Sequence, residues 1–163
     1  MDAREVIAAN PFFAEVLEER DIAALARRAL TVQRPAGTDL IHEDGADASL
    51  FIIVEGTVEV IAGDSRHGKH IAELGPGGFF GEMSLMTGER RSATVRAVTD
   101  VTVLEITKSA ITPFLDASPE LIERFAAVLK KRQAELDRAY GASPFSVLDQ
   151  GGFAAMIRRF FGG

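Results

Sequence analysis

The spacing of hydrophobic residues predicts helices at both ends of the chain and short strands between them. Segment 1–36 carries apolar residues at helical intervals after Asn10 and Pro11, a preferred N-cap and a preferred first helical residue. Over segment 32–106 the pattern changes to apolar runs such as Leu50–Val54 and to alternating apolar and polar residues, which are typical of strands. Helices therefore flank a central β unit.

Two helices are expected after this β unit. A short one over 108–115 is followed by a long one over 118–140, which starts at a Ser-Pro-Glu sequence and stops before Gly141. Arg132 interrupts the apolar face of the long helix. The other members of that face are Leu121, Phe125, Val128, Leu129, Leu136 and Tyr140.

The last segment, 141–163, is a tail broken by Gly, Ser and Pro. Its final residues, FAAMIRRFFGG, can form a short amphipathic helix with Phe153 and Ile157 on the apolar side. Three placements stay open from the sequence: docked on this domain, docked on a neighbour, or frayed. Residues 1–140 form the domain proper.

The glycine residues are concentrated in the predicted β unit and in the tail. None occurs from Met1 to Ala36, ten occur from Gly37 to Gly88, none from Glu89 to Tyr140, and five after that. Short strands separated by glycine turns indicate a small antiparallel barrel or jelly roll. The fold class is α+β. The polar turn at 64–69 is expected to be a mobile hairpin.

The amino-acid composition and net charge exclude several classes of function. The chain has 163 residues, enough for one core, and no Cys, so thiolate and disulfide chemistry are excluded. Its net charge of −6 argues against nonspecific binding to nucleic acid. It lacks an apolar run of the roughly 18 residues that span a bilayer, and a charged-then-apolar signal peptide does not open it. We expect a cytoplasmic domain without a membrane span.

The stretch 75–94, GPGGFFGEMSLMTGERRSAT, carries the candidate chemistry. Its glycines let main-chain N–H groups approach an anion, and a short helix begins near Glu82. Arg91 can pair with a phosphate through two charge-assisted hydrogen bonds. A carboxylate repels phosphate, so Glu82 is expected to accept from a hydroxyl, such as that of a ribose. A sugar hydroxyl beside a phosphate describes a nucleotide.

These residues resemble the phosphate-binding cassette of cyclic-nucleotide-binding domains, found in cAMP-receptor transcription factors, kinase regulatory subunits and cyclic-nucleotide-gated channels. The family pattern, F-G-E-[LM]-[AS]-L followed by R-[STA]-A-T-V, reads here FGEMSL from Phe80 and RSATV from Arg91. The resemblance implies an eight-stranded antiparallel β-roll with N-terminal helices, a hinge helix and a long lid helix. Its ligand would be cAMP, with cGMP as a second ligand, and no cofactor is implied.

The resemblance also assigns site residues. The expected ligand-binding set is Gly81, Glu82, Met83, Ser84, Arg91, Ser92, Ala93 and Arg132. Ser92 can contact phosphate or a guanine base. Arg132 is placed to reach over a bound purine from the lid helix, although a solvated surface arginine is the alternative.

Neither a DNA-reading helix pair nor a second cassette is present, so we expect the gating domain of a prokaryotic channel, tethered to its membrane part and contacting neighbouring subunits. A free-standing cyclic-nucleotide receptor acting on a partner protein is the alternative. A cupin-like jelly-roll enzyme is a third hypothesis. Such an enzyme needs a His-x-His metal site, whereas His42 is alone and His67 and His70 lie in a polar hairpin, so neither catalysis nor a metal is expected.

Overall fold

The structure is a computed structural model, and it describes residues 2–62 and 69–162. The strands are β1 (Leu30–Arg34), β2 (Asp39–Ile41), β3 (Leu50–Glu55), β4 (Val58–Ala62), β5 (Lys69–Leu74), β6 (Phe79–Phe80), β7 (Thr94–Ala97) and β8 (Val101–Ile106). The helices are α1 (Ala3–Ala8), α2 (Pro11–Ala14), α3 (Glu19–Arg28), α4 (Glu82–Thr87), α5 (Lys108–Ala117), α6 (Leu121–Tyr140), the 3-10 helix η1 (Pro144–Val147) and α7 (Gln150–Gly162).

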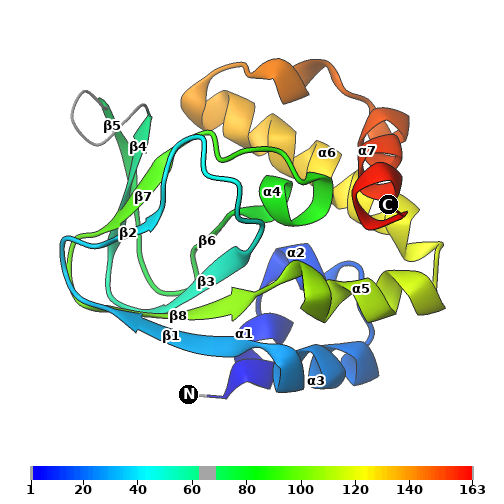
Figure 1. The fold of residues 1–163 in the computed structure, drawn as a ribbon, viewed down its shortest axis with the longest axis horizontal. Helices are drawn as coiled ribbons and strands as arrows, with labels where there is room; N and C mark the ends of the chain where they lie inside the picture. The colour runs from blue at the N-terminus through cyan, green and yellow to red at the C-terminus, as the bar shows by residue number, and fades with distance from the viewer. Residues whose placement is uncertain (1, 63–68, 163) are drawn as a thin grey trace.

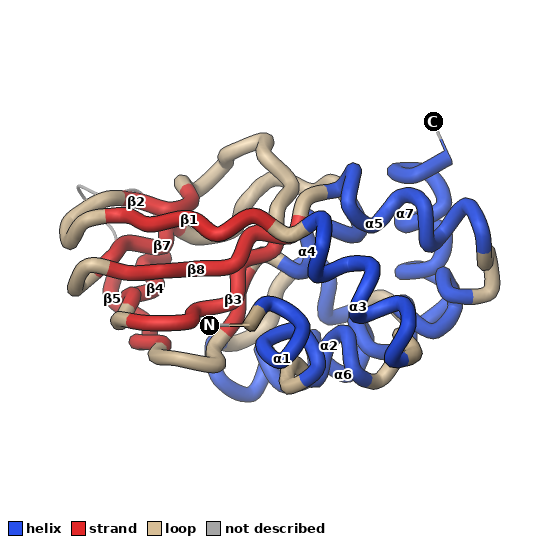
Figure 2. Tube along the Cα trace, turned by 90° about the horizontal axis from the view of Figure 1, so that it is seen from below, coloured by secondary structure: helices blue, strands red, loops and turns tan. Residues whose placement is uncertain are grey.

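The described strands form two four-stranded antiparallel sheets, in the orders β1-β8-β3-β6 and β2-β7-β4-β5. All the helices gather at one end of this roll (Figure 2). The predicted α+β fold with an antiparallel roll is confirmed. The hairpin expected at 64–69 lies, apart from Lys69, outside the described residues.

The alternating strand residues fill the inside of the roll. Phe51 of β3 stacks on Phe80 of β6 with ring centroids 5.3 Å apart, and Val58 and Val103 are fully buried beside them. This core fixes the roll wall on which the cassette begins, because Phe80 immediately precedes Gly81.

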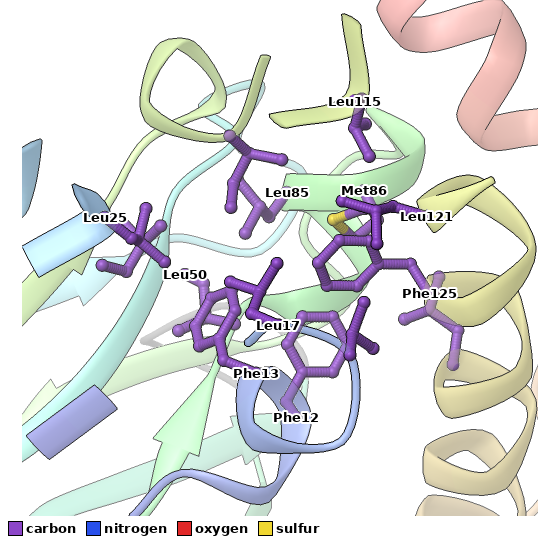
Figure 3. Packing of buried hydrophobic residues seen from close by; sticks show 14 of the residues in the cluster. Phe12, Phe13, Leu17, Leu25, Leu50, Leu85, Met86, Leu115, Leu121 and Phe125 are labelled. Atoms are coloured by element: carbon purple, nitrogen blue, oxygen red, sulfur yellow. The ribbon is translucent and has the colours of Figure 1, made fainter. Parts of the chain in front are cut away.

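A second core joins the roll to the helices (Figure 3). Asn10 caps α2 as predicted, since its side-chain oxygen accepts from the amides of Phe12 and Phe13. Phe12 contacts Phe125 of α6, with ring centroids 5.6 Å apart. Removing either ring would leave a cavity of the kind that costs about 3–5 kcal/mol. Helix α6, the predicted lid helix, is therefore anchored at its N-terminal half.

The lid helix begins at Leu121, later than the Ser118 start predicted from the sequence. Ser118 instead ends α5, because its backbone is not helical and its amide donates to the carbonyl oxygen of Phe114. Pro119 and Glu120 then form the turn between the two helices. The hinge predicted at 108–115 extends to Ala117.

The tail is docked on this domain. Helix α7 packs against α6 and α4, as Figure 1 shows, and buries Phe153, Ala154 and Ile157. Arg158 pairs with Glu123 of α6 at 2.6 Å. The sequence leaves three placements open, and the structure shows the one in which the tail docks on this domain. Among the described residues, no helix has both the length and the apolar character needed to cross a membrane.

Helix α7 also contacts the end of the cassette helix. Gly88 ends α4 with a φ of 74°, and a Cβ atom built on it would lie 2.4 Å from a ring carbon of Phe160. Lys108 lies over the same Phe160 ring, with Nζ 4.0 Å from the centroid. Only glycine fits at position 88 without displacing the Phe160 ring.

Candidate ligand-binding site

A cavity of about 300 Å³ lies between the roll, the cassette and the lid helix. The structure brings together at this cavity all eight residues proposed from the sequence. They are Gly81, Glu82, Met83, Ser84, Arg91, Ser92 and Ala93 from the cassette and Arg132 from α6. Their contacts with a ligand remain a prediction.

Gly81 sets the geometry of the cassette. Its φ is 93°, and a Cβ atom there would lie 2.5 Å from the carbonyl oxygen of Ser49 and 2.7 Å from Nη1 of Arg91. Glycine is thus required by conformation and by space. Helix α4 starts directly after it without a side-chain cap, so the amides of its first turn, including those of Met83 and Ser84, are not used by a capping side chain.

Arg91 is almost completely buried, with 1% of its side chain exposed. Nη2 donates to Asp47 and to the carbonyl oxygen of Ser49, both at 2.7 Å, and Nε donates to Asp47 at 3.4 Å. Nη1 makes a 3.4 Å contact with the carbonyl oxygen of Gly81. A guanidinium has five N–H donors, so one donor on Nη1 is without a partner among residues 2–62 and 69–162. The structure holds Arg91 in place at the cavity, and its pairing with a phosphate through two hydrogen bonds stays a prediction.

Glu82 and Arg132 connect the cassette to the lid. Nε of Arg132 donates to Oε1 of Glu82 at 2.8 Å, and the guanidinium carbon lies 4.4 Å from the Phe79 ring centroid. Burial lowers the pKa of Arg132. The charge attraction and hydrogen bonds that Glu82 and Glu135 provide outweigh burial and raise that pKa, so the guanidinium stays charged. Oε2 of Glu82 has no partner among the described residues and remains available as an acceptor.

Ser92 and Ala93 line the cavity beside Arg91. Their amides make no hydrogen bond to any described residue, because β7 starts only at Thr94. Two N–H donors without a partner in the described part of the chain therefore lie beside a buried guanidinium, a combination of groups that can attract an anion. This edge of the cavity is its positively polarised end.

Metal ligands are not grouped in the described part of the chain, where no three His, Cys, Asp or Glu side chains meet. His42 lies beside Asp39 at 3.5 Å, and His70 lies 3.2 Å from Glu59. Each histidine faces one carboxylate, and Asp39 is also bound by Arg96 at 2.7 Å.

The geometry of this cavity agrees with the similarity of the chain to a known protein family. Residues 31–118 match the cyclic nucleotide-binding domain family. The chain belongs to this family. The match contains the whole cassette and ends before α6, so Arg132 and α7 lie outside the matched residues.

Relatives of this domain have different effectors. A cyclic nucleotide-gated potassium channel of Mesorhizobium japonicum is 37% identical over 131 residues, which are 79% of this chain and 34% of the channel. The cAMP-activated global transcriptional regulator CRP of Escherichia coli O157:H7 is 34% identical over 60% of this chain and 48% of the regulator. The chain thus spans about a third and about half of these two relatives.

A solved structure shares the fold over most of the domain. The N-terminal domain of a transcriptional regulator from Streptomyces coelicolor superposes with a TM-score of 0.67 at 27% identity, covering 88% of this chain and 99% of that domain.

Sequence reasoning missed part of the cavity of this cyclic nucleotide-binding domain. Asp47, which holds Arg91, comes from a loop without periodic pattern. Phe79 could have been found, since it directly precedes the cassette motif. The rest of the missed wall comes from two places. The roll and the cassette contribute Ile41, Val60, Ile71, Leu74, Phe80, Arg90 and Val95. The end of α6 and the segment after it contribute Gln133, Leu136, Gly141, Ala142, Ser143 and Phe145.

Proposed function

We propose that this domain is a sensor of cAMP, with cGMP as a weaker second ligand, and that it is the cytosolic gating domain of a prokaryotic cyclic-nucleotide-regulated potassium channel. The channel relative supports this effector because its similarity covers 79% of the chain. In this proposal the domain is a regulatory module without catalysis, and its partners are the channel's membrane part and neighbouring subunits.

One observation carries the proposal: a single cavity is bounded by the cassette on one side and by the lid helix on the other. The cyclic phosphate would lie at Arg91 and the amides of Ser92 and Ala93. The ribose 2′-hydroxyl would donate to Oε2 of Glu82, while Oε1 keeps its bond to Arg132. The purine would then lie toward the lid.

Signalling follows from this arrangement. A ligand that contacts the cassette and the lid together binds the closed arrangement more tightly than the open one, and so shifts the population toward it. Because α7 packs on both α6 and α4, movement of the lid also moves the C-terminal helix. The output is a displacement of α6 and α7 relative to the roll.

Calorimetric titration with cAMP, cGMP and cyclic di-GMP tests the ligand class. We expect saturable 1:1 binding of both cyclic mononucleotides, with cAMP tighter, and no binding of the dinucleotide. Absence of binding by either mononucleotide to the folded protein would refute the proposal. Gating itself is tested by ion flux through the full channel with and without cAMP.

Glu82 should account for recognition of the ribose. Replacing cAMP by 2′-deoxy-cAMP should lose about 1.5–3 kcal/mol, the value of a hydrogen bond to a charged group, and Glu82→Gln should reduce that loss. Glu135→Gln is the matched control, because Glu135 also contacts Arg132, at 3.4 Å, but does not line the cavity. An undiminished 2′-deoxy penalty in Glu82→Gln would assign the hydroxyl to another residue.

Ser92 should affect the choice of purine. Its side chain is exposed at the cavity edge, where its hydroxyl can bond to a guanine as well as to phosphate. Titrating Ser92→Ala with both nucleotides should show a larger loss for cGMP than for cAMP. Equal losses for the two ligands would restrict Ser92 to the phosphate.

A further inference from the structure

The lid wall of the cavity carries a side-chain amide that is held in one orientation. Gln133 lines the cavity and is 6% exposed. Its Nε2 donates to Oδ1 of Asp137 at 2.7 Å and to Oγ of Ser143 at 3.3 Å. Ser146 also donates to Oδ1 of Asp137, at 2.7 Å. The end of the lid and the segment after it thus form one polar network around this amide.

The network decides which end of the amide is free. An ionised carboxylate can only accept, so the NH₂ group of Gln133 must point toward Asp137. The carbonyl oxygen, Oε1, is then left at the other end. This oxygen accepts no hydrogen bond from any described residue. Among those residues, Asn10 Nδ2 is the fully buried side-chain atom that lacks a partner, so Oε1 of Gln133 is not fully buried. Gln133 therefore offers a fixed acceptor at the cavity wall.

The position of this acceptor suits a base rather than a phosphate. Leu136 of α6 and Phe145 of η1 also line the cavity and provide apolar surface. Arg132, its chain neighbour, has donors only and is engaged by Glu82. Of the two polar lid side chains, Gln133 is the one that can accept from a base.

We propose that Oε1 of Gln133, held in place by Asp137 and Ser143, accepts a hydrogen bond from the 6-amino group of adenine and makes the cavity select adenine over purines that carry an oxygen at that position. This inference rests on the proposed cyclic-nucleotide function. A 6-oxo group facing Oε1 would bring two acceptors together and leave both unsatisfied. The segment after the lid, through Ser143, thereby takes part in ligand choice.

The test compares two ligands that differ only in the amino group: cAMP and purine riboside 3′,5′-cyclic monophosphate. In the unmodified protein cAMP should bind about 3- to 10-fold more tightly, the range expected for one hydrogen bond. In Gln133→Met, which keeps the length of the side chain but loses the carbonyl, the ratio should fall to near one. A ratio that persists in this variant, or is already near one in the unmodified protein, would overturn the inference.

A second variant tests the positioning network without changing Gln133. Asp137→Asn can donate as well as accept, so the Gln133 amide can turn over and present its NH₂ group. The preference for cAMP over inosine 3′,5′-cyclic monophosphate, a 6-oxo purine, should then shrink or reverse. A purely structural role for Asp137 would weaken both ligands equally and leave the preference unchanged, which would contradict the inference. If neither cyclic nucleotide bound the unmodified protein, the proposed function itself would fail.

Discussion

Arg91→Ala should lower the affinity for cAMP by about 2–5 kcal/mol, the cost of removing one partner from a desolvated charge pair. This corresponds to an increase of roughly 30-fold or more in the dissociation constant. The guanidinium is 1% exposed at the cavity, so its bond to a phosphate would form where water competes little. Calorimetry measures the loss directly.

The contacts of Arg91 with Asp47 and Ser49 also hold the loop before β3 against the cassette. The variant therefore needs a thermal unfolding measurement to establish that it is folded. Arg90→Ala is the matched control, because Arg90 lines the same cavity but is exposed and donates to a backbone oxygen. We expect a much smaller loss there. Wild-type affinity in a folded Arg91→Ala protein would remove Arg91 from the site.

Saturating cAMP should raise the melting temperature and order the lid helix. At a hundredfold excess over the dissociation constant, binding contributes about 2.7 kcal/mol of stabilisation. For a domain of this size the melting temperature should rise by about 5–10 °C. Amide exchange over 125–140 should slow as well, because the ligand would join the cassette to the part of α6 beyond its buried anchor at Phe125.

Arg132→Ala should reduce both the slowing of exchange and the affinity, since Arg132 is the side chain that connects the lid to Glu82. Lys131→Ala is its control. Lys131 pairs with Glu15 on the surface, with 64% of its side chain exposed, and exposed pairs contribute little. Exchange in α6 that is indifferent to saturating cAMP would mean that the domain binds nucleotide without the proposed switch.

The cassette was predictable because its residues are consecutive. A motif of about twenty residues carries its own glycines, helix start and arginine, so the sequence alone places Gly81, Glu82 and Arg91 at one site. Arg132 could be added because a charged residue interrupts an apolar helical face. The structure places all of these at one cavity.

The rest depends on contacts that sequence spacing does not encode. Asp47 reaches Arg91 from a loop with no repeating pattern. The apolar spacing of 153–160 predicts an amphipathic helix, but it does not determine which surface that helix covers, so the sequence alone does not predict where α7 docks. Gln133 gave no signal either, because its role depends on the fold of the segment that brings Ser143 back to it.

The contact between Gly88 and Phe160 links the evolution of the cassette to that of the tail. Any side chain at position 88 would overlap the aromatic ring at position 160. Among homologous chains that keep α7, substitutions at these two positions should therefore covary, with a larger residue at 88 occurring beside a smaller one at 160. In chains that lack α7, position 88 should be free of this steric restriction, although its left-handed backbone would still favour glycine or asparagine.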